Sequence, residues 1–410
     1  MGHGEAPLAE TQIEGLRNRA RMYADAQDIS RDDMSLAFEP TWATDLELLV
    51  GGENFFPRIG DDLKAAQESI HINQFGFKSD TLGIDATNIL VERAQAGVKV
   101  RLVVDDQGSM PWSMSKDMYA DLASAGVEIV VNQGFRPIAK RGLVGGDLKR
   151  RSNLGGLGHP DHRKAIIIDG KIGYVGGAGF QEHFETGEFH DLFVRMTGAV
   201  VSQFQLVFLA SFRYLGGPPI DDLERLIPDL EQPDDAVRAT VLHNAPGFRP
   251  ISVAIAESID ASRETLDIVN PYVADPPAVR RIVGAAKRGV KVRLLVPEKA
   301  NNPVLAMAQR HHHTAMLESG VEIWEHPRMV HSKAFVRDGI EVLVGTCNLE
   351  AWSLKRSYEI NMRTRSTDLA RQFAEDFFAP GIDISKPGTA PQGAASKTLA
   401  RGVAALHPFL

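Results

Sequence analysis

The sequence repeats itself once, and this repetition constrains the fold more than any other feature. Three blocks occur twice in the same order, with offsets of 192, 194 and 169 residues between the copies. The paired blocks are residues 96–104 with 288–296, residues 125–130 with 319–324, and residues 162–177 with 331–346. One shared block could arise by chance, whereas three in one order indicate that a whole domain was duplicated.

Each half has the pattern of an α/β domain. The runs VKVRLVV and VKVRLLV are short, apolar and rich in β-branched residues, and each follows a helical pattern that ends at Gly97 or Gly289. A glycine at this place caps a helix, and a run of this kind is typical of a buried strand. The alternation predicts an α/β sheet in each half.

The duplication also predicts the division of the 410 residues. The polar segment 228–235, which contains two prolines, is typical of a linker between the repeats. We therefore expect four parts, in the order of a helical extension over residues 1–40, a first repeat over 41–228, a second repeat over 236–383 and a tail over 384–410.

The first half is longer than the second by 25 residues, and the extra residues lie within Asn132–Asp161. This stretch is glycine-rich and basic, which predicts a long loop. The loop is either simply solvated, or it draws anionic headgroups or rests on an anionic membrane surface. The apolar end of the C-terminal tail has two readings as well, an interfacial helix or a segment packed on the protein.

Composition excludes several classes of protein. A single cysteine, Cys347, rules out internal disulfide bonds and a cysteine-rich zinc site. The formal net charge of −8 disfavours general nucleic-acid binding. We find no signal peptide and no apolar stretch of membrane-spanning length, because polar residues interrupt the nearest one, Val200–Leu215. We expect a cytoplasmic protein that is soluble or peripheral on the inner face of the membrane.

The third repeated block carries the chemistry. Both copies read His-x-Lys-x4-Asp followed by glycine, and the motif residues are His162, Lys164 and Asp169, then His331, Lys333 and Asp338. Residues i and i+2 of a strand share a face, so we expect each imidazole to lie beside its ammonium group on a strand. The Asp-Gly pairs that follow predict tight hairpin turns.

Two such sets at matched places in a duplicated fold suggest one shared site. Two imidazoles and two ammonium groups facing one cleft suit a phosphodiester, with one histidine attacking phosphorus and the other protonating the leaving oxygen. The lysines would hold the non-bridging oxygens. This chemistry requires no metal ion and no cofactor.

A carboxylate follows each motif at a similar distance. Asp191 lies 29 residues after His162, and Glu359 lies 28 residues after His331. A nucleophilic imidazole needs an acceptor for its other nitrogen, which fixes its tautomer and orientation. We therefore expect Asp191 and Glu359 to orient the two histidines.

The doubled motif resembles that of the phospholipase D superfamily, and the sequence around it looks most like that of the bacterial cardiolipin synthases. This resemblance implies two pseudo-symmetric α/β/α sandwich repeats with the active site at their interface. It implies that His162 is the nucleophile and His331 the general acid and then base. It also implies that Lys164, Lys333 and Asn348 bind phosphate, and that Asp169 and Asp338 mainly hold the motif strands.

The sequence departs from the family pattern after the first motif. The second half reads Gly345, Thr346, Cys347 and Asn348, whereas the first half has Gly177 in the position of Thr346 and no asparagine. Gly177 and Thr346 are candidate substrate-binding positions together with Asn348. The N-terminal membrane helices common in the cardiolipin synthases have no counterpart, which puts integral membrane anchoring in doubt.

Together with this resemblance, the sequence predicts a cardiolipin synthase-like phosphatidyltransferase that acts on glycerophospholipids through a phosphohistidine and makes peripheral contact with an anionic membrane. Hydrolysis of phospholipids is an alternative, and so is metal-independent cleavage of nucleic-acid phosphodiesters, although no stable nucleic-acid partner is expected. A non-catalytic phospholipid-binding protein is the third alternative, and paired imidazoles argue against it.

Overall fold

The computed structural model describes residues 9–26, 29–109, 114–132 and 159–405. Most of the basic insertion, residues 133–158, and the last part of the C-terminal tail, residues 406–410, lie outside the described residues. The expectations for those two segments therefore stay predictions.

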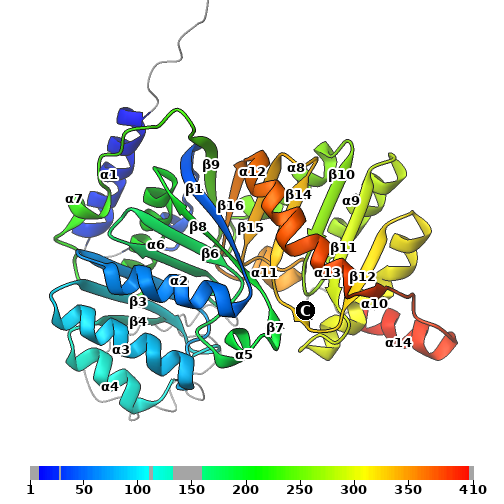
Figure 1. Ribbon diagram of the computed structural model, residues 1–410, viewed down its shortest axis with the longest axis horizontal. Helices are drawn as coiled ribbons and strands as arrows, with labels where there is room; N and C mark the ends of the chain where they lie inside the picture. The colour runs from blue at the N-terminus through cyan, green and yellow to red at the C-terminus, as the bar shows by residue number, and fades with distance from the viewer. Residues whose placement is uncertain (1–8, 27–28, 110–113, 133–158, 406–410) are drawn as a thin grey trace, which may run out of the picture.

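The described residues form one fifteen-stranded sheet that runs through both halves, in the order β17-β12-β11-β10-β14-β15-β16-β9-β1-β8-β6-β5-β2-β3-β4 (Figure 1). Two further strands, β7 (Phe189–His190) and β13 (Met329–Val330), form a small parallel sheet of their own. The bounds of the large sheet's strands are β1 (Thr41–Val50), β2 (Ser69–Gln74), β3 (Lys99–Asp105), β4 (Glu128–Asn132), β5 (Lys164–Ile168), β6 (Ile172–Gly176), β8 (Leu192–Thr197), β9 (Val237–Asn244), β10 (Thr265–Val269), β11 (Lys291–Pro297), β12 (Glu322–His326), β14 (Lys333–Arg337), β15 (Glu341–Gly345), β16 (Glu359–Arg365) and β17 (Lys386–Pro387).

The sheet is pseudo-symmetric about its central antiparallel pair, β1 and β9. Moving outward from this pair, the first half presents β8, β6, β5, β2, β3 and β4, and the second half presents β16, β15, β14, β10, β11 and β12 in the matching order. In both halves the three outer strands of this series are parallel and the inner ones antiparallel. This arrangement confirms the fold class expected from the duplication.

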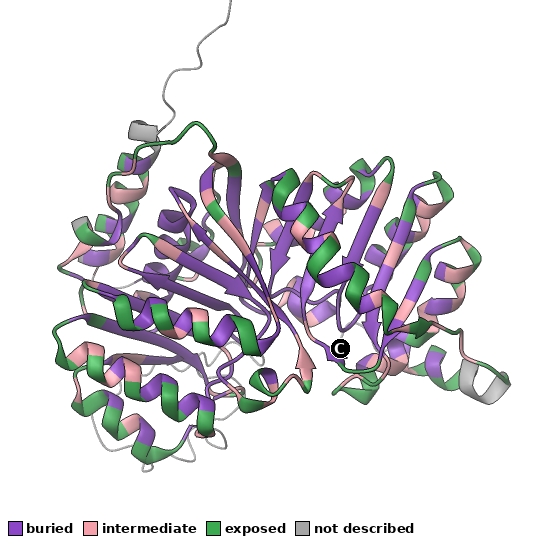
Figure 2. Ribbon diagram, in the orientation of Figure 1, coloured by how far each residue is buried: buried purple, intermediate pink, exposed green. Residues whose placement is uncertain are grey.

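Helices cover both faces of the sheet, and the strands between them are mostly buried (Figure 2). One apolar core lies under α2, α3 and α4 in the first half, and an equivalent core lies under α8, α9 and α10 in the second. A third core, under α1, α6 and η2, joins both halves. The helix bounds are α1 (Ala9–Asp25), η1 (Asp32–Met34), α2 (Gly52–Ala65), α3 (Thr81–Gln95), α4 (Lys116–Ser124), α5 (Glu182–Glu185), α6 (Val200–Tyr214), α7 (Leu223–Leu226), α8 (Pro250–Ala261), α9 (Pro276–Lys287), α10 (Pro303–Glu318), α11 (Ala351–Lys355), α12 (Thr367–Gln372), η2 (Phe373–Phe378), α13 (Ala379–Asp383) and α14 (Ala394–Ala404).

The apolar stretch from Val200 forms helix α6, which is buried in the shared core. Its two glutamines form hydrogen bonds there, whereas the buried hydroxyl of Ser202 has no partner among the described residues. Gln203 donates to the carbonyl of Glu39 and accepts from the backbone N–H of Val241, and Gln205 contacts the imidazole of His71. These hydrogen bonds remove the cost of burying amides in an apolar core. Within the described ranges, no helix has the length and apolar character needed to cross a membrane.

The Asp-Gly hairpins form as predicted. Asp169 and Gly170 have φ values of 52° and 63°, and Asp338 and Gly339 have 51° and 62°, the left-handed backbone that tight hairpin turns require. The predicted strand start is wrong, because β5 begins at Lys164 and β14 at Lys333. The two histidines therefore precede their strands, where the backbone leaves the main sheet and pairs with the other half.

Candidate active site

His162 is held at the centre of the molecule by residues of the second half. Its backbone N–H donates to the carbonyl of Tyr358 at 2.9 Å, and its Nδ1 lies 3.1 Å from both carboxylate oxygens of Glu359. The ring of Phe75 meets the imidazole edge-to-face at 4.9 Å. With Nδ1 directed at the carboxylate, Nε2 is the nitrogen left to meet a substrate.

His331 is held in the same way by residues of the first half. Its backbone N–H donates to the carbonyl of His190 at 2.9 Å, and its Nδ1 lies 3.0 Å from Oδ2 of Asp191. The rings of Phe184 and Phe189 pack against the imidazole, with centroid distances of 5.4 and 5.9 Å. Each histidine is thus oriented by the carboxylate of the opposite repeat, a crossing that the sequence spacing does not reveal.

The two lysines lie between these pairs and are buried. Nζ of Lys164 donates to the carbonyl of His162 at 2.6 Å, and Nζ of Lys333 donates to the carbonyl of His331. Each lysine also acts on the histidine of the other half, since both ammonium charges lower the pKa of His162 and of His331. The six groups therefore belong to one electrostatic centre, which forms where the two repeats meet.

The basic groups of this centre all have lowered pKa values. Burial, followed by the charges of Lys164 and Lys333, lowers the pKa of His162 well below its ordinary value. Burial, together with Lys333, lowers the pKa of His331 to about 3. Burial also lowers the pKa of Lys164 to about 7 and that of Lys333 to about 8. A bound anion would stabilise the protonated form of all four groups, so the site is suited to a phosphate.

The two orienting carboxylates differ in charge. Burial raises the pKa of Glu359 to about 7, against the effect of Lys164. Burial acts in the same direction on Asp191, but its hydrogen bond from His331 and the nearby charges hold the pKa of that carboxyl below its ordinary value. Asp191 also accepts from the hydroxyl of Ser332 at 3.0 Å, and Glu359 accepts from the hydroxyl of Thr346.

Asn348 lies in the loop after β15 with its Oδ1 buried, and the described residues provide no hydrogen-bond partner for that oxygen. The equivalent position of the first half is Gly179, where a Cβ would lie 2.7 Å from the carbonyl oxygen of Gly76. An asparagine therefore does not fit in the first half without a backbone shift, which gives a physical reason for the departure from the family pattern.

The structure does not bring Asp169 and Asp338 into the centre. They lie at the far ends of β5 and β14, roughly 16 Å along the strand from the lysines. The carboxylate of Asp169 accepts from the backbone N–H groups of residues 67–69, and that of Asp338 from those of residues 263–265. Both therefore hold the hairpins, as the resemblance implies, and neither is placed to take part in the reaction.

Sequence reasoning missed the buried polar groups behind His162. Asp105, at the end of β3, accepts from the backbone N–H of Asp161 and from the amide of Asn132, both at 2.7 Å. Asp161 in turn pairs with Arg163 at 2.8 Å. The sequence does contain a signal, because the second repeat has Pro297 where the first has Asp105. A carboxylate at the end of an apolar strand needs hydrogen-bond partners if it is buried.

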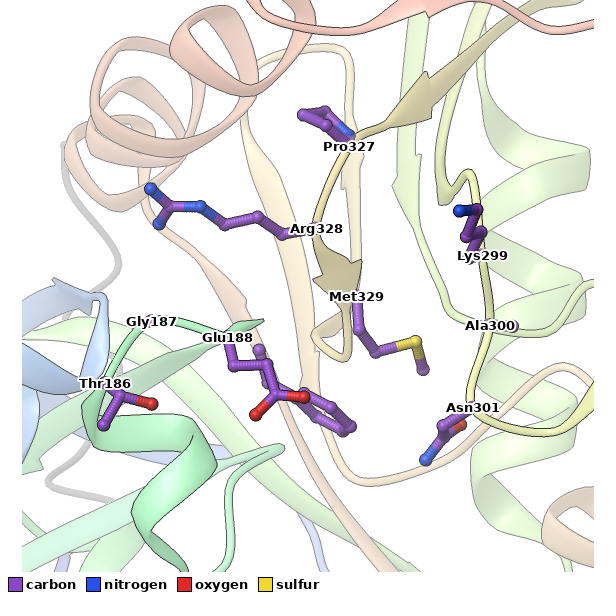
Figure 3. A pocket seen from close by; sticks show the side chains of 10 residues that line it. Thr186, Gly187, Glu188, Lys299, Ala300, Asn301, Pro327, Arg328 and Met329 are labelled. Carbon is purple, nitrogen blue, oxygen red and sulfur yellow. The ribbon is translucent and has the colours of Figure 1, made fainter.

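A pocket of about 590 Å³ lies between the two repeats (Figure 3). The walls come from residues 186–189 of the first repeat and from residues 299–301 and 327–329 of the second. Phe189 belongs both to the pocket and to the packing around His331. The volume is typical of a site for a small molecule or a headgroup.

Comparison with solved structures supports the same fold. The chain matches a phosphatidylserine synthase of Haemophilus influenzae Rd KW20 with a TM-score of 0.64, over 97% of this chain and 100% of that one. The two sequences are 12% identical, so this likeness concerns the fold alone.

Comparison with sequences identifies relatives that are longer than this chain. A cardiolipin synthase of Geobacillus sp. (strain WCH70) is 30% identical over 344 residues, which cover 82% of this chain and 66% of that protein. A probable cardiolipin synthase of Bacillus subtilis (strain 168) is 28% identical over 366 residues, with 87% and 70% covered. The chain thus spans slightly less than two thirds of the first relative. A family model described as "Cardiolipin synthase, PLD-like domain" matches residues 59–208 and 255–379, and the chain belongs to this family of phospholipase D-like proteins.

Proposed function

We propose that this protein is a phosphatidyltransferase that acts on glycerophospholipids in the manner of a cardiolipin synthase. One observation carries the proposal, namely that two imidazoles, each held through Nδ1 by a carboxylate, share one buried centre with two lysines. A protein that only binds phospholipid has no need for two oriented imidazoles. The relatives of Geobacillus and Bacillus subtilis are described as cardiolipin synthases, which supports the choice of substrate.

The reaction takes place in two displacements at phosphorus. In the first, Nε2 of His162 forms a bond to phosphorus while the bond to the departing alcohol oxygen breaks, and His331 gives that oxygen a proton. In the second, an acceptor hydroxyl gives its proton to His331 and attacks phosphorus, and the bond to His162 breaks. Lys164 and Lys333 stabilise the charge on the non-bridging oxygens in both transition states.

The low pKa of His331 fits this sequence of steps. Burial, followed by the ammonium charges of Lys333 and Lys164, lowers the pKa of His331 to about 3. A phosphodiester brings a negative charge between those ammonium groups, which raises the pKa of His331 and favours the protonated form that the first displacement needs. Because the donor and product are membrane lipids, we also propose that the protein works in peripheral contact with an anionic membrane.

The test combines lipid analysis with trapping of the intermediate. Purified protein is incubated with phosphatidylglycerol vesicles in chelator, and products are measured by lipid mass spectrometry. The reaction is quenched in alkaline denaturant, because the P–N bond of phosphohistidine is acid-labile, and the modified residue is mapped. We expect cardiolipin and glycerol as products and the modification on His162.

His162→Ala is expected to abolish turnover and labelling, whereas His311→Ala, a control in helix α10, is expected to leave both unchanged. Release of phosphatidic acid without lipid transfer would identify a hydrolase instead. A label on His331 would reverse the assignment of nucleophile and acid. Cleavage of single-stranded DNA with no reaction on lipid would replace the proposal with a nucleic-acid phosphodiesterase.

A further inference from the structure

The pocket between the two repeats is built on the short β7–β13 ladder. This ladder leads to His331, which is the acid and then the base of the proposed reaction. In the parallel sheet of β7 and β13, Phe189 pairs with Met329, and both side chains line the pocket. The next residues along the two strands lead directly to Asp191 and His331. The pocket is therefore linked to His331 through Phe189, whose ring centroid lies 5.9 Å from that of the imidazole.

On the His162 side of the centre, the described residues form no equivalent two-stranded ladder. There the corresponding backbone contact is the single bridge between Asp161 and Tyr358, and the residues that match Met329 and Phe189 are Pro160 and Ser357. In a displacement at phosphorus, the attacking histidine and the alcohol oxygen lie on opposite sides of the phosphorus atom. If His162 attacks, the alcohol lies on the side of His331, where the pocket is.

The pocket combines an apolar floor with cationic groups at its mouth. Phe189 and Met329 lie in one apolar cluster, and Lys299 and Arg328 are exposed at the rim, with Glu188 as the opposing charge. Within the described part of the chain, neither cation has a carboxylate within salt-bridge distance. The guanidinium of Arg328 extends over Gly187 of the other repeat, where a Cβ would lie 3.3 Å from its Nη1 (Figure 3).

The polar wall offers a further donor. The hydroxyl of Tyr272 contacts Oδ1 of Asn301, so the NH₂ group is the donor that this amide can offer a ligand. A site with two cations, an amide donor and an apolar floor matches a glycerol whose far end carries a phosphodiester and acyl chains. A free neutral alcohol would gain nothing from the cations.

We propose that this pocket binds the headgroup of the acceptor phospholipid, with Lys299 and Arg328 holding the acceptor's own phosphodiester while its terminal hydroxyl reaches His331. This inference rests on the proposed function and makes it more specific. Binding of the acceptor's phosphodiester would favour transfer to a second anionic phospholipid over transfer to glycerol or water. The two phosphates of the product, joined through one glycerol, would occupy the histidine centre and the pocket.

The test measures how one intermediate is divided between two acceptors. Phosphatidylglycerol is the only donor, and deuterated glycerol competes with phosphatidylglycerol as acceptor, so that cardiolipin and deuterium-labelled phosphatidylglycerol are counted in the same sample. The double variant Lys299→Gln/Arg328→Gln is expected to lower the ratio of cardiolipin to labelled phosphatidylglycerol at least 10-fold, with the rate of glycerol exchange within 2-fold of wild type. Lys99→Gln/Lys287→Gln, which removes two exposed cations elsewhere, is expected to leave the ratio unchanged.

An unchanged ratio in the pocket variant would overturn the inference, and so would an equal fall in both products. A second measurement needs no turnover. Glycerophosphoglycerol is expected to protect Arg328 from phenylglyoxal, as mapped by peptide mass spectrometry, more strongly than the exposed Arg280. Protection in a protein that transfers no lipid would refute the proposed function and keep the headgroup site, whereas active transfer without protection would refute the site alone.

Discussion

Gly177 and Thr346 occupy equivalent positions in the two repeats, yet they support their carboxylates differently. A Cβ on Gly177 would lie 2.5 Å from both carboxylate oxygens of Asp191 and 2.8 Å from the carbonyl oxygen of His331. The hydroxyl of Thr346, by contrast, donates to Glu359. The two residues were predicted to bind substrate, which stays a prediction, and the structure gives both a positioning role as well.

Replacing Gly177 with alanine is expected to lower kcat about 10- to 100-fold, because the added methyl group must displace Asp191 or the backbone of His331. Steady-state transfer assays with phosphatidylglycerol would measure the effect, and circular dichroism would check the fold. Gly60→Ala in helix α2 is the matched control, since a Cβ there meets nothing closer than 3.9 Å. Wild-type kcat in Gly177→Ala would show that the close approach has no effect on catalysis.

At the scale of elements, the aspartate of each motif fastens a hairpin to the neighbouring strand. The carboxylate of Asp338 accepts from three successive backbone N–H groups just before β10, and Asp169 does the same before β2. The hairpins carry Lys333 and Lys164 at their opposite ends. The aspartates thus fix the strands that present the lysines, at a distance from the reaction.

Asp338→Asn is expected to lower the free energy of unfolding by about 1–3 kcal/mol, because a charged acceptor of three N–H groups is lost. Burial acts to raise the pKa of Asp338, but the backbone N–H groups and Arg337 hold it below its ordinary value. The stabilisation is therefore present above the pKa of the unfolded aspartate and is lost as the pH falls through the folded value.

Urea unfolding at neutral and at acid pH would measure this difference between wild type and Asp338→Asn, which is expected to shrink at acid pH. Asp383→Asn, at an exposed position of α13, is the control and should change stability by less than about 0.5 kcal/mol. A large loss of kcat in folded Asp338→Asn would instead indicate a direct part in the reaction.

At the scale of the whole molecule, the centre exists only where the two repeats meet. Glu359 of the second repeat orients His162, and Asp191 of the first orients His331. Backbone hydrogen bonds also join the two repeats, since each histidine N–H donates to a carbonyl of the other half. The shared core under α6 and η2 and the pairing of β1 with β9 hold these contacts in register.

Because each carboxylate orients the histidine of the opposite repeat, we expect it to control the step that this histidine performs. With a phosphatidyl ester of 4-nitrophenol, whose leaving group needs no acid, Glu359→Gln is expected to slow the nitrophenol burst about 100-fold or more. Asp191→Asn is expected to keep the burst and to slow the later turnover by a similar factor, because His331 must then take a proton from the acceptor. Rapid-quench measurement of the burst would decide, and the opposite result would mean that His331 is the nucleophile.

The sequence alone determined a good part of this protein. The repeats predicted the two-fold α/β architecture because duplicated blocks must fold alike, and the Asp-Gly pairs predicted the hairpins because few residues tolerate positive φ. The paired His-Lys motifs and the spacing of Asp191 and Glu359 predicted the residues that the structure brings together. Apart from the duplication itself, these signals are local, since each depends on neighbours within a few tens of residues.

Only the tertiary structure decided how the local pieces meet. It showed that the carboxylates serve the opposite histidines, that the histidines lie outside their strands, and that Gly177 allows Asp191 to approach. It also formed the pocket between the two repeats from segments more than 100 residues apart. Such contacts depend on how the two repeats dock through the pairing of β1 with β9 and the core they share, and no spacing along the chain encodes that relative position directly.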